Sequence, residues 1–121
     1  MRIIEPGHIY LPATLDGVVE APLVFVKRVG GGYPGNEPPA HPGTNLQECW
    51  RAEIDRLKYL NRQIPCDENL LCQMHLRLAI VLLESRAARR HNRPVPGFVE
   101  EVETMPVCPH CLHIGCPGGG K

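Results

Sequence analysis

The sequence predicts an α+β fold, in which a small N-terminal antiparallel β-sheet is followed by a two-helix antiparallel hairpin and an irregular Cys-rich C-terminal tail. Three observations predict this class. β-branched residues and a turn dipeptide occur in the first 28 positions, apolar residues recur with a helical period between 44 and 92, and Gly, Pro and Cys dominate the end of the chain. We therefore divide the chain into a domain over 1–93 and a tail over 94–121.

The composition of the chain excludes several classes of protein. The 121 residues include 13 basic and 13 acidic side chains, and a net charge of zero argues against binding to DNA or RNA. The longest apolar run, Leu78–Leu83, is too short to cross a bilayer, and the N-terminus lacks the apolar segment of a secretory signal. We expect a cytoplasmic protein without membrane contact, and the small size of the chain favours a homo-oligomer.

The first predicted element is a β-hairpin over 8–28. His8–Leu11 reads as one strand, and the Pro12 that follows it favours an edge position in the sheet. Asp16-Gly17 is a typical hairpin turn dipeptide. Pro22–Arg28 is rich in Val and Phe and predicts the second strand.

A loop is predicted over 29–43, directly after the strand that ends with Arg28. Its many Gly and Pro residues permit no regular element. A connection of this length predicts an exposed loop that serves as a mobile lid or as a binding loop.

The helical hairpin is predicted over 44–92. Its first helix begins at a capping box, formed by Thr44 with Gln47 or by Asn45 with Glu48, and Pro65 ends it. The apolar stripe of this helix consists of Leu46, Trp50, Ile54, Leu57 and Ile64.

The second helix is predicted from Asp67, whose side chain can cap it, to about His91, before Arg93-Pro94. The residues expected on its inner face are Leu71, Met74, Leu78, Val81, Leu82 and Ser85. The short connection predicts that the two helices run antiparallel.

Basic residues gather at the C-terminal end of the second helix, where the sequence has Arg86, Arg89, Arg90 and Arg93. In one interpretation, these arginines only stabilise the negative C-terminal end of the helix and improve the solubility of the protein. Guanidinium groups also match phosphate oxygens in pairs, so the same run is a candidate phosphate-binding surface.

The tail contains a candidate zinc site. Cys108 and Cys111 have the spacing of a zinc knuckle, Cys116 is a third candidate ligand and His113 a fourth, with His110 nearby. The alternative is a tail with free thiols. A structural zinc ion is therefore a possible cofactor of the tail, and a zinc-stabilised protein-interaction module is the alternative function of the chain.

Catalytic motifs are missing from the sequence. It contains no HExxH, no GxSxG and no Gly-rich phosphate loop between a strand and a helix. No nucleophile and base can be paired, so we expect that the protein is not an enzyme.

The stretch from Gly43 to Arg90 is similar to a known family. Its matching elements are Gly-Thr-x-x-Gln-Glu from Gly43, then Arg51, Ile54-Asp55-Arg56, Tyr59, Gln63, Glu68-Asn69, Leu76-Arg77 and Glu84-x-Arg86-Ala87, with Pro6-Gly7-His8 and Phe25-Val26-Lys27-Arg28 upstream. Together they resemble the phage-encoded Thoeris anti-defence proteins of the cyclic-ADP-ribose sponge family. The helical hairpin also resembles that of the anti-CBASS cyclic-nucleotide sponges. The resemblance covers about residues 3–93 and not the tail.

The resemblance implies a signal-binding domain over 1–93 that sequesters nucleotide immune messengers in the host cell cytoplasm without cleaving them. The implied ligands are glycocyclic ADP-ribose isomers made by TIR-domain proteins. Some members also bind cyclic di- or trinucleotides at a second site. The family requires no cofactor for binding, and its members are dimer-based homo-oligomers, which suggests a hexamer.

Four positions are assigned to the ligand by the resemblance, with Arg90 of the basic run added to them. Arg28 and Arg86 would bind the pyrophosphate, Tyr59 would stack on adenine in place of a Phe of the family, and Asn69 would hydrogen-bond the base or ribose. The guanidinium groups and the ring also suit a compact, aromatic dianion on chemical grounds.

Helix geometry adds a requirement for two chains. Asn69 and Arg86 are 17 positions apart on one predicted helix, which corresponds to about 25 Å of axial rise. One nucleotide cannot reach both in the same chain. We therefore expect Tyr59 and Asn69 of one chain to meet Arg86 of another.

Overall fold

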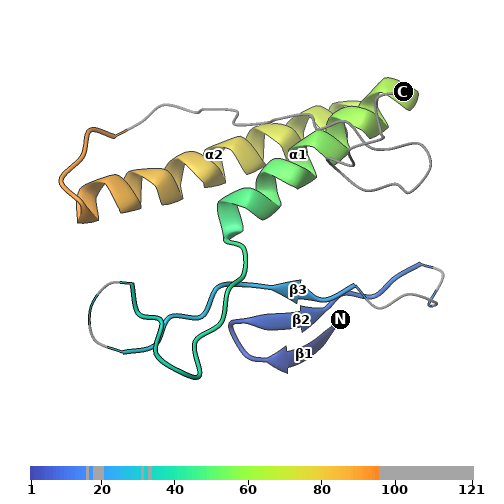
Figure 1. Cartoon of the computed structure of the whole chain (residues 1–121). Helices are drawn as coiled ribbons and strands as arrows, with labels where there is room; N and C mark the ends of the chain where they lie inside the picture. The colour runs from blue at the N-terminus through green and yellow to red at the C-terminus, as the bar shows by residue number, and fades with distance from the viewer. Residues whose placement is uncertain (16, 18–20, 31, 33, 96–121) are drawn as a thin grey trace, which may run out of the picture.

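The computed structural model describes residues 1–15, 17, 21–30, 32 and 34–95. The strands and helices follow one another as β1 (Arg2–Glu5), β2 (Ile9–Leu11), β3 (Leu23–Val24), α1 (Leu46–Gln63) and α2 (Asp67–Arg90). A three-stranded antiparallel sheet and a helical hairpin form two layers, which the segment before α1 connects (Figure 1). The predicted α+β fold is confirmed, and the tail lies outside the described residues.

The sheet has one strand more than the sequence predicted. Its order is β1-β2-β3, with Arg2 opposite Leu11 and Ile9 opposite Val24. β2 is therefore the central strand, and the predicted edge position was wrong. Pro12 causes no conflict because β2 ends one residue before it, where no ladder N–H is required. Asp16 of the predicted turn lies outside the described residues.

The second predicted strand is shorter than expected. The loop after it returns alongside the segment that follows β3 and pairs with it. Beyond β3, single bridges join Phe25 to Thr44, Lys27 to His41 and Val29 to Asn36. The close approach depends on Gly43, because a Cβ atom there would lie 2.5 Å from the carbonyl carbon of Phe25. The loop is irregular, as predicted, but backbone pairing attaches it to the sheet layer.

The ends of the helices settle two predictions about capping. Asn45 is the N-cap of α1, and its Oδ1 accepts a hydrogen bond of 2.9 Å from the Glu48 backbone N–H. Asp67 is not a cap, because Cys66 occupies that position without a side-chain cap bond. Asp67 is instead the first residue of α2, where its carboxylate lies near the positive end of the helix.

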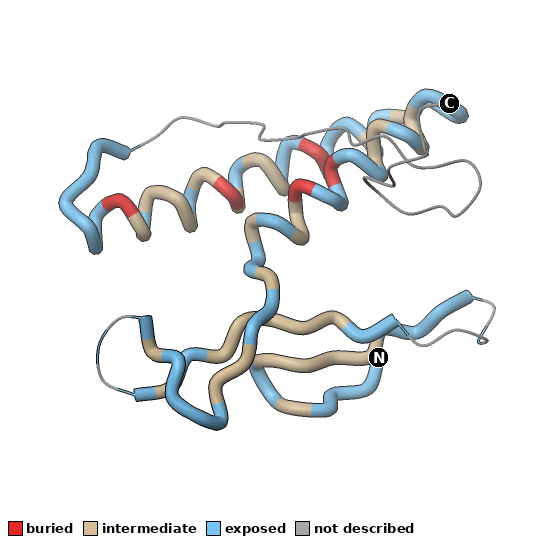
Figure 2. Tube along the Cα trace, in the orientation of Figure 1, coloured by how far each residue is buried: buried red, intermediate tan, exposed pale blue. Residues whose placement is uncertain are grey.

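The hairpin contains all the buried side chains of the described residues (Figure 2). They are Arg51, Ile54, Gln73, Ile80 and Ala88. No strand packs against a helix within the described part of the chain. Neither α1 nor α2 has the combination of length and hydropathy that a membrane-crossing helix needs. The core between the helices is thus small, and neither helix of the described residues covers a face of the sheet.

The predicted inner face of α2 was wrong. Leu71, Met74, Leu78 and Leu82 are 52–61% exposed, whereas the residues buried on α2 are Gln73, Ile80 and Ala88. Apolar residues occur around most of α2, so their periodicity could not identify the face that meets α1. On α1, the first residue Leu46 and the C-cap residue Ile64 are also exposed (44% and 76%), although both were expected on the apolar stripe.

A buried arginine links the two helices. Arg51 is 9% exposed, and its Nη1 and Nη2 lie 3.4 Å from Glu48 Oε1 and 3.5 Å from Glu84 Oε1. Its Nε is buried and has no hydrogen-bond partner among the residues that the structure describes. The bridge to Glu84 therefore holds α1 against α2, while part of the desolvation cost of the guanidinium is not offset.

Glu84→Gln should destabilise the protein more than Arg51→Met. Losing the Glu84 charge leaves a buried cation short of a partner, which costs about 1–3 kcal/mol. Met keeps the apolar stem of Arg51, and the carboxylates that lose their partner are partly exposed to water. The free energy of unfolding of Arg51→Met should therefore stay within about 1 kcal/mol of wild type. Urea unfolding at one fixed protein concentration measures both values. A larger loss for Arg51→Met than for Glu84→Gln would contradict this account.

Candidate functional site

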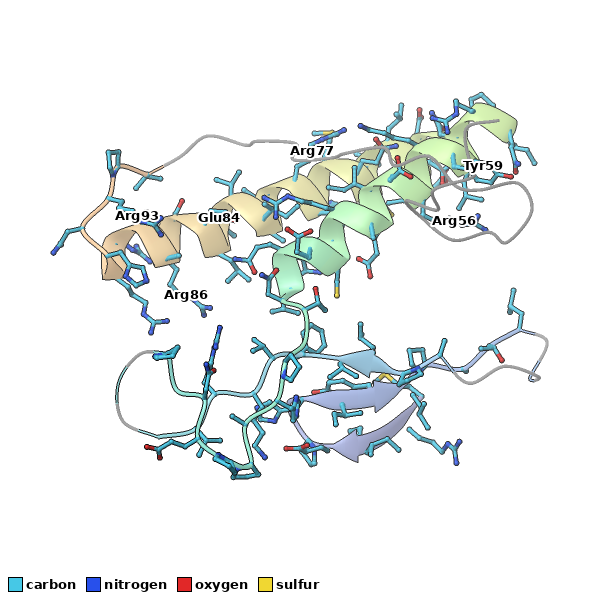
Figure 3. All side chains as sticks on the ribbon, viewed as in Figure 1. Arg56, Tyr59, Arg77, Glu84, Arg86 and Arg93 are labelled. Carbon is cyan, nitrogen blue, oxygen red and sulfur yellow. The ribbon has the colours of Figure 1, made fainter. Side chains whose placement is uncertain are left out.

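The ligand residues suggested by the sequence lie in separate parts of the structure. Tyr59 is near the tip of the helical hairpin, whereas Arg86 is near the opposite end of α2 (Figure 3). Asn69 is in the first turn of α2, close to the tip. A single chain therefore does not bring Tyr59 and Asn69 to Arg86, as the axial rise of the helix predicted.

At the tip, Tyr59 presents a ring that is accessible to a ligand. It is 44% exposed, and the Arg56 guanidinium carbon lies 5.2 Å from its ring centroid. This distance is typical of a cation–π contact. An adenine base could stack on the ring, and the neighbouring cation would favour a ligand that carries phosphate.

Asn69 has a structural role at the tip. Its Nδ2 donates to the Ile64 carbonyl oxygen over 3.4 Å and to Asn61 Oδ1 over 3.5 Å. The same Asn61 oxygen accepts a bond of 3.0 Å from the Cys66 backbone N–H. These contacts hold the connection between α1 and α2. Because both Asn69 bonds are long, a ligand could replace them at a small cost.

At the other end of α2, arginine side chains are exposed. The side chains of Arg86, Arg89 and Arg90 make no hydrogen bond or ion pair with any residue that the structure describes. The nearest acidic side chain in the sequence, Glu84, is already paired with Arg51. Figure 3 shows Arg86 on the side of α2 that faces the loop after β3, which we call the loop layer together with the strand segment that it pairs with. These guanidinium groups are thus available for an anion.

The loop layer contains a hollow of about 410 Å³. Arg28 is in its wall, and Arg28 Nη1 donates to the Pro34 carbonyl oxygen (3.2 Å) and to Asn36 Oδ1 (3.0 Å). These bonds fix the direction of the guanidinium and leave its other donors without a partner among the described residues. The hollow has the volume of a small-molecule site. Its lining consists of Val26, Arg28, Asn36, Ala40, His41, Pro42 and Gly43.

The sequence did not predict a polar cluster that lies beside the hollow and includes His41 of its lining. The Glu5 carboxylate contacts the Lys27 ammonium, and it lies 3.5 Å from His41 Nε2 and 3.7 Å from His8 Nδ1. The hydrogen bond from Lys27 is the main cause that lowers the pKa of Glu5 below its usual value. The cluster ties His41 of the loop to β1. A Glu, a Lys and two His scattered over 37 positions gave no spacing signal.

The predicted zinc ligands Cys108, Cys111, His113 and Cys116 lie outside the described residues. Within the part that the structure describes, no three His, Cys, Asp or Glu side chains converge as metal ligands do. The zinc site of the tail therefore stays a prediction.

Comparisons of the chain with models of protein families, with characterised proteins and with solved structures gave no match.

Proposed function

We propose that this protein is a phage anti-defence sponge, which binds a nucleotide immune messenger and holds it without cleaving it. The observation that carries the proposal is the set of exposed arginines at the end of α2, whose side chains pair with no described residue. One of them, Arg86, lies on the side of α2 that faces the layer with Arg28 and its hollow. The resemblance of residues 3–93 to the cyclic-ADP-ribose sponges supports the same conclusion.

The proposed ligand is a glycocyclic ADP-ribose isomer. Its pyrophosphate carries two negative charges, which suit the guanidinium groups of Arg28, Arg86 and Arg90. Its adenine suits the exposed ring of Tyr59, where Arg56 adds a nearby positive charge. Sequestration requires only these binding contacts and no proton transfer or nucleophile.

The site is proposed to form between two chains of a homo-oligomer, since Tyr59 and Arg86 are at opposite ends of the hairpin. A hexamer built from dimers follows from the resemblance, as does a second site for cyclic di- or trinucleotides. The protein would act in the cytoplasm of the infected host.

Mass spectrometry of the small molecules released by heat tests this function. The purified protein is incubated with extract from cells that express an active TIR-domain enzyme, washed and denatured. We expect release of an intact ADP-ribose-derived cyclic nucleotide, and none from extract of cells with an inactive enzyme. Release of hydrolysed product would indicate an enzyme, and absence of any nucleotide would refute the proposal.

A further inference from the structure

Two side chains that can bind a metal ion lie next to each other on the surface of α2. Cys72 and His75 are three positions apart, which makes them neighbours on one face of a helix. Both are exposed, and Cys72 is a free thiol. Neither side chain makes a hydrogen bond or ion pair with a described residue. This thiol and this imidazole therefore have no structural role within the described part of the chain.

The knuckle of the tail, Cys108 and Cys111, needs two further ligands. Zinc sites with a Cys-x2-Cys pair usually take their other two ligands from a separate segment, at least about 12 residues away. His113 and Cys116 are much closer than that, since Cys108 to Cys116 covers only nine residues. The pair on α2 meets the spacing, and it adds a third thiolate and an imidazole to the two thiolates of the knuckle.

The end of α2 turns the chain back toward the start of the helix. Asn92 has a φ of 51°, and the Arg93 backbone N–H donates to the Ala88 carbonyl oxygen over 2.8 Å. This bond is the mark of a Schellman motif, with Asn92 in the left-handed position that follows the helix. Figure 1 shows the last described residues turned back over the end of α2. The described chain therefore ends in a direction that leads toward Cys72 and His75.

The tail is long enough to reach this pair. His75 lies 15 positions before Arg90, which corresponds to about 22 Å along the helix axis. Thirteen residues lead from Val95 to Cys108, and an extended chain of this length spans up to about 43 Å. The knuckle can therefore meet His75 of its own chain, with length to spare for a curved path.

Exposed apolar side chains lie on the path between the end of α2 and His75. Leu78 and Leu82 are three and seven positions after His75, on the same face, and they are 56% and 60% exposed. The tail has Phe98 and Val102, which are four positions apart like the two leucines. A tail fixed at His75 would cover these leucines and remove their apolar surface from water.

We propose that Cys72 and His75 of α2 bind one zinc ion together with Cys108 and Cys111 of the same chain. Three thiolates and one imidazole are a common tetrahedral set for structural zinc, and soft sulfur ligands select Zn²⁺ over Mg²⁺ and Ca²⁺. With four protein ligands the ion has no open position for a substrate, so its role is to fasten the tail to the helical hairpin. The inference does not rest on the proposed function, because none of these residues is assigned to the nucleotide.

Metal analysis of the full-length protein, kept reduced, tests the site. The wild-type chain should bind one zinc ion, and Co²⁺ in its place should show the absorption of a tetrahedral ion with three thiolates. Cys72→Ser and His75→Gln should each lower the zinc affinity by at least about a hundredfold. In Cys72→Ser, the sulfur-to-cobalt absorption should also fall to that of two thiolates.

Cys66→Ser is the matched control for these variants. Cys66 is also a thiol of the hairpin, but it is the N-cap residue of α2, six positions before Cys72. This change should leave both the zinc affinity and the cobalt absorption as in wild type. Circular dichroism checks that Cys72→Ser and His75→Gln remain helical.

Cleavage of the tail provides a second measurement. A glutamate-specific protease can cut after Glu100, Glu101 and Glu103. Adding Zn²⁺ should slow this cleavage at least about tenfold in the wild-type chain, because fastening the tail lowers the population that the protease can attack. The same addition should leave the cleavage rate of Cys72→Ser unchanged, although its knuckle is intact.

Three outcomes would overturn the proposal. One is a reduced wild-type chain that binds no zinc. Another is zinc affinity that survives both Cys72→Ser and His75→Gln, which would place the ion within the tail, on His113 and Cys116. The third is a mixture of Cys72→Ser and Cys108→Ser chains that regains the zinc neither binds alone, because the tail would then reach α2 of another chain.

Discussion

Replacing Arg86 with alanine should lower the affinity for a cyclic ADP-ribose-type signal by roughly tenfold to a hundredfold. The change leaves phosphate charge without a guanidinium partner, and a charge-assisted hydrogen bond contributes about 1.5–3 kcal/mol. Arg86→Lys should recover little of this loss, because an ammonium group cannot make the paired contact. Isothermal titration calorimetry with the isolated cyclic nucleotide measures each value.

The matched control for this experiment is Arg93→Ala. Arg93 belongs to the same basic run and is exposed, but it lies beyond the end of α2 and outside the proposed ligand residues. If the run acts only through its total charge, both alanine variants will lose affinity equally. We expect a large loss for Arg86 and less than about a threefold loss for Arg93 at physiological salt. Unchanged affinity of Arg86→Ala would remove this residue from the site.

Gly43→Ala should destabilise the fold by at least about 2 kcal/mol, because overpacking against backbone cannot be relieved by a rotamer change. The new Cβ would lie 2.5–2.7 Å from backbone atoms of Val24, Phe25 and Val26. The chain would have to separate there, which breaks the hydrogen bonds between Thr44 and this segment. The hollow should be lost with them, since Gly43 and Val26 both line it.

Gly7→Ala is the control for the general effect of removing a glycine. Gly7 has a φ of 83°, but a Cβ there meets nothing within 4 Å. Its cost should be about 1 kcal/mol, from backbone strain alone. Urea unfolding at equal protein concentration compares the two variants. A Gly43→Ala protein as stable as the Gly7→Ala protein would show that the loop can move away from the sheet layer without loss.

The site was only partly accessible from the sequence. Helix geometry separated Tyr59 from Arg86, and the structure places them at opposite ends of the hairpin. The hollow beside Arg28 could not be anticipated, because its wall forms when the loop pairs with the extended segment after β3. The same is true of the cluster around Glu5, whose members come from distant positions and meet only in three dimensions.

Local signals were sufficient for the helices. The bounds of α1 and α2 follow from the Asn45 cap, from Pro65 and from apolar periodicity, all of which act within a few residues. The sequence by itself therefore determined that a helical hairpin follows a small sheet. It left Thr44 and Asn45 as alternative caps of α1 and assigned the cap of α2 to Asp67, whereas the caps are Asn45 and Cys66.

The tertiary structure alone decided which face of each element is inside. β1 became an edge strand and made β2 central, although Pro12 suggested the reverse. On α2, apolar residues lie on two faces, and α1 covers the one with Gln73 and Ile80, where Arg51 also pairs with Glu84. The physical reason is that burial depends on the partner surface, which a periodic pattern in one helix does not specify.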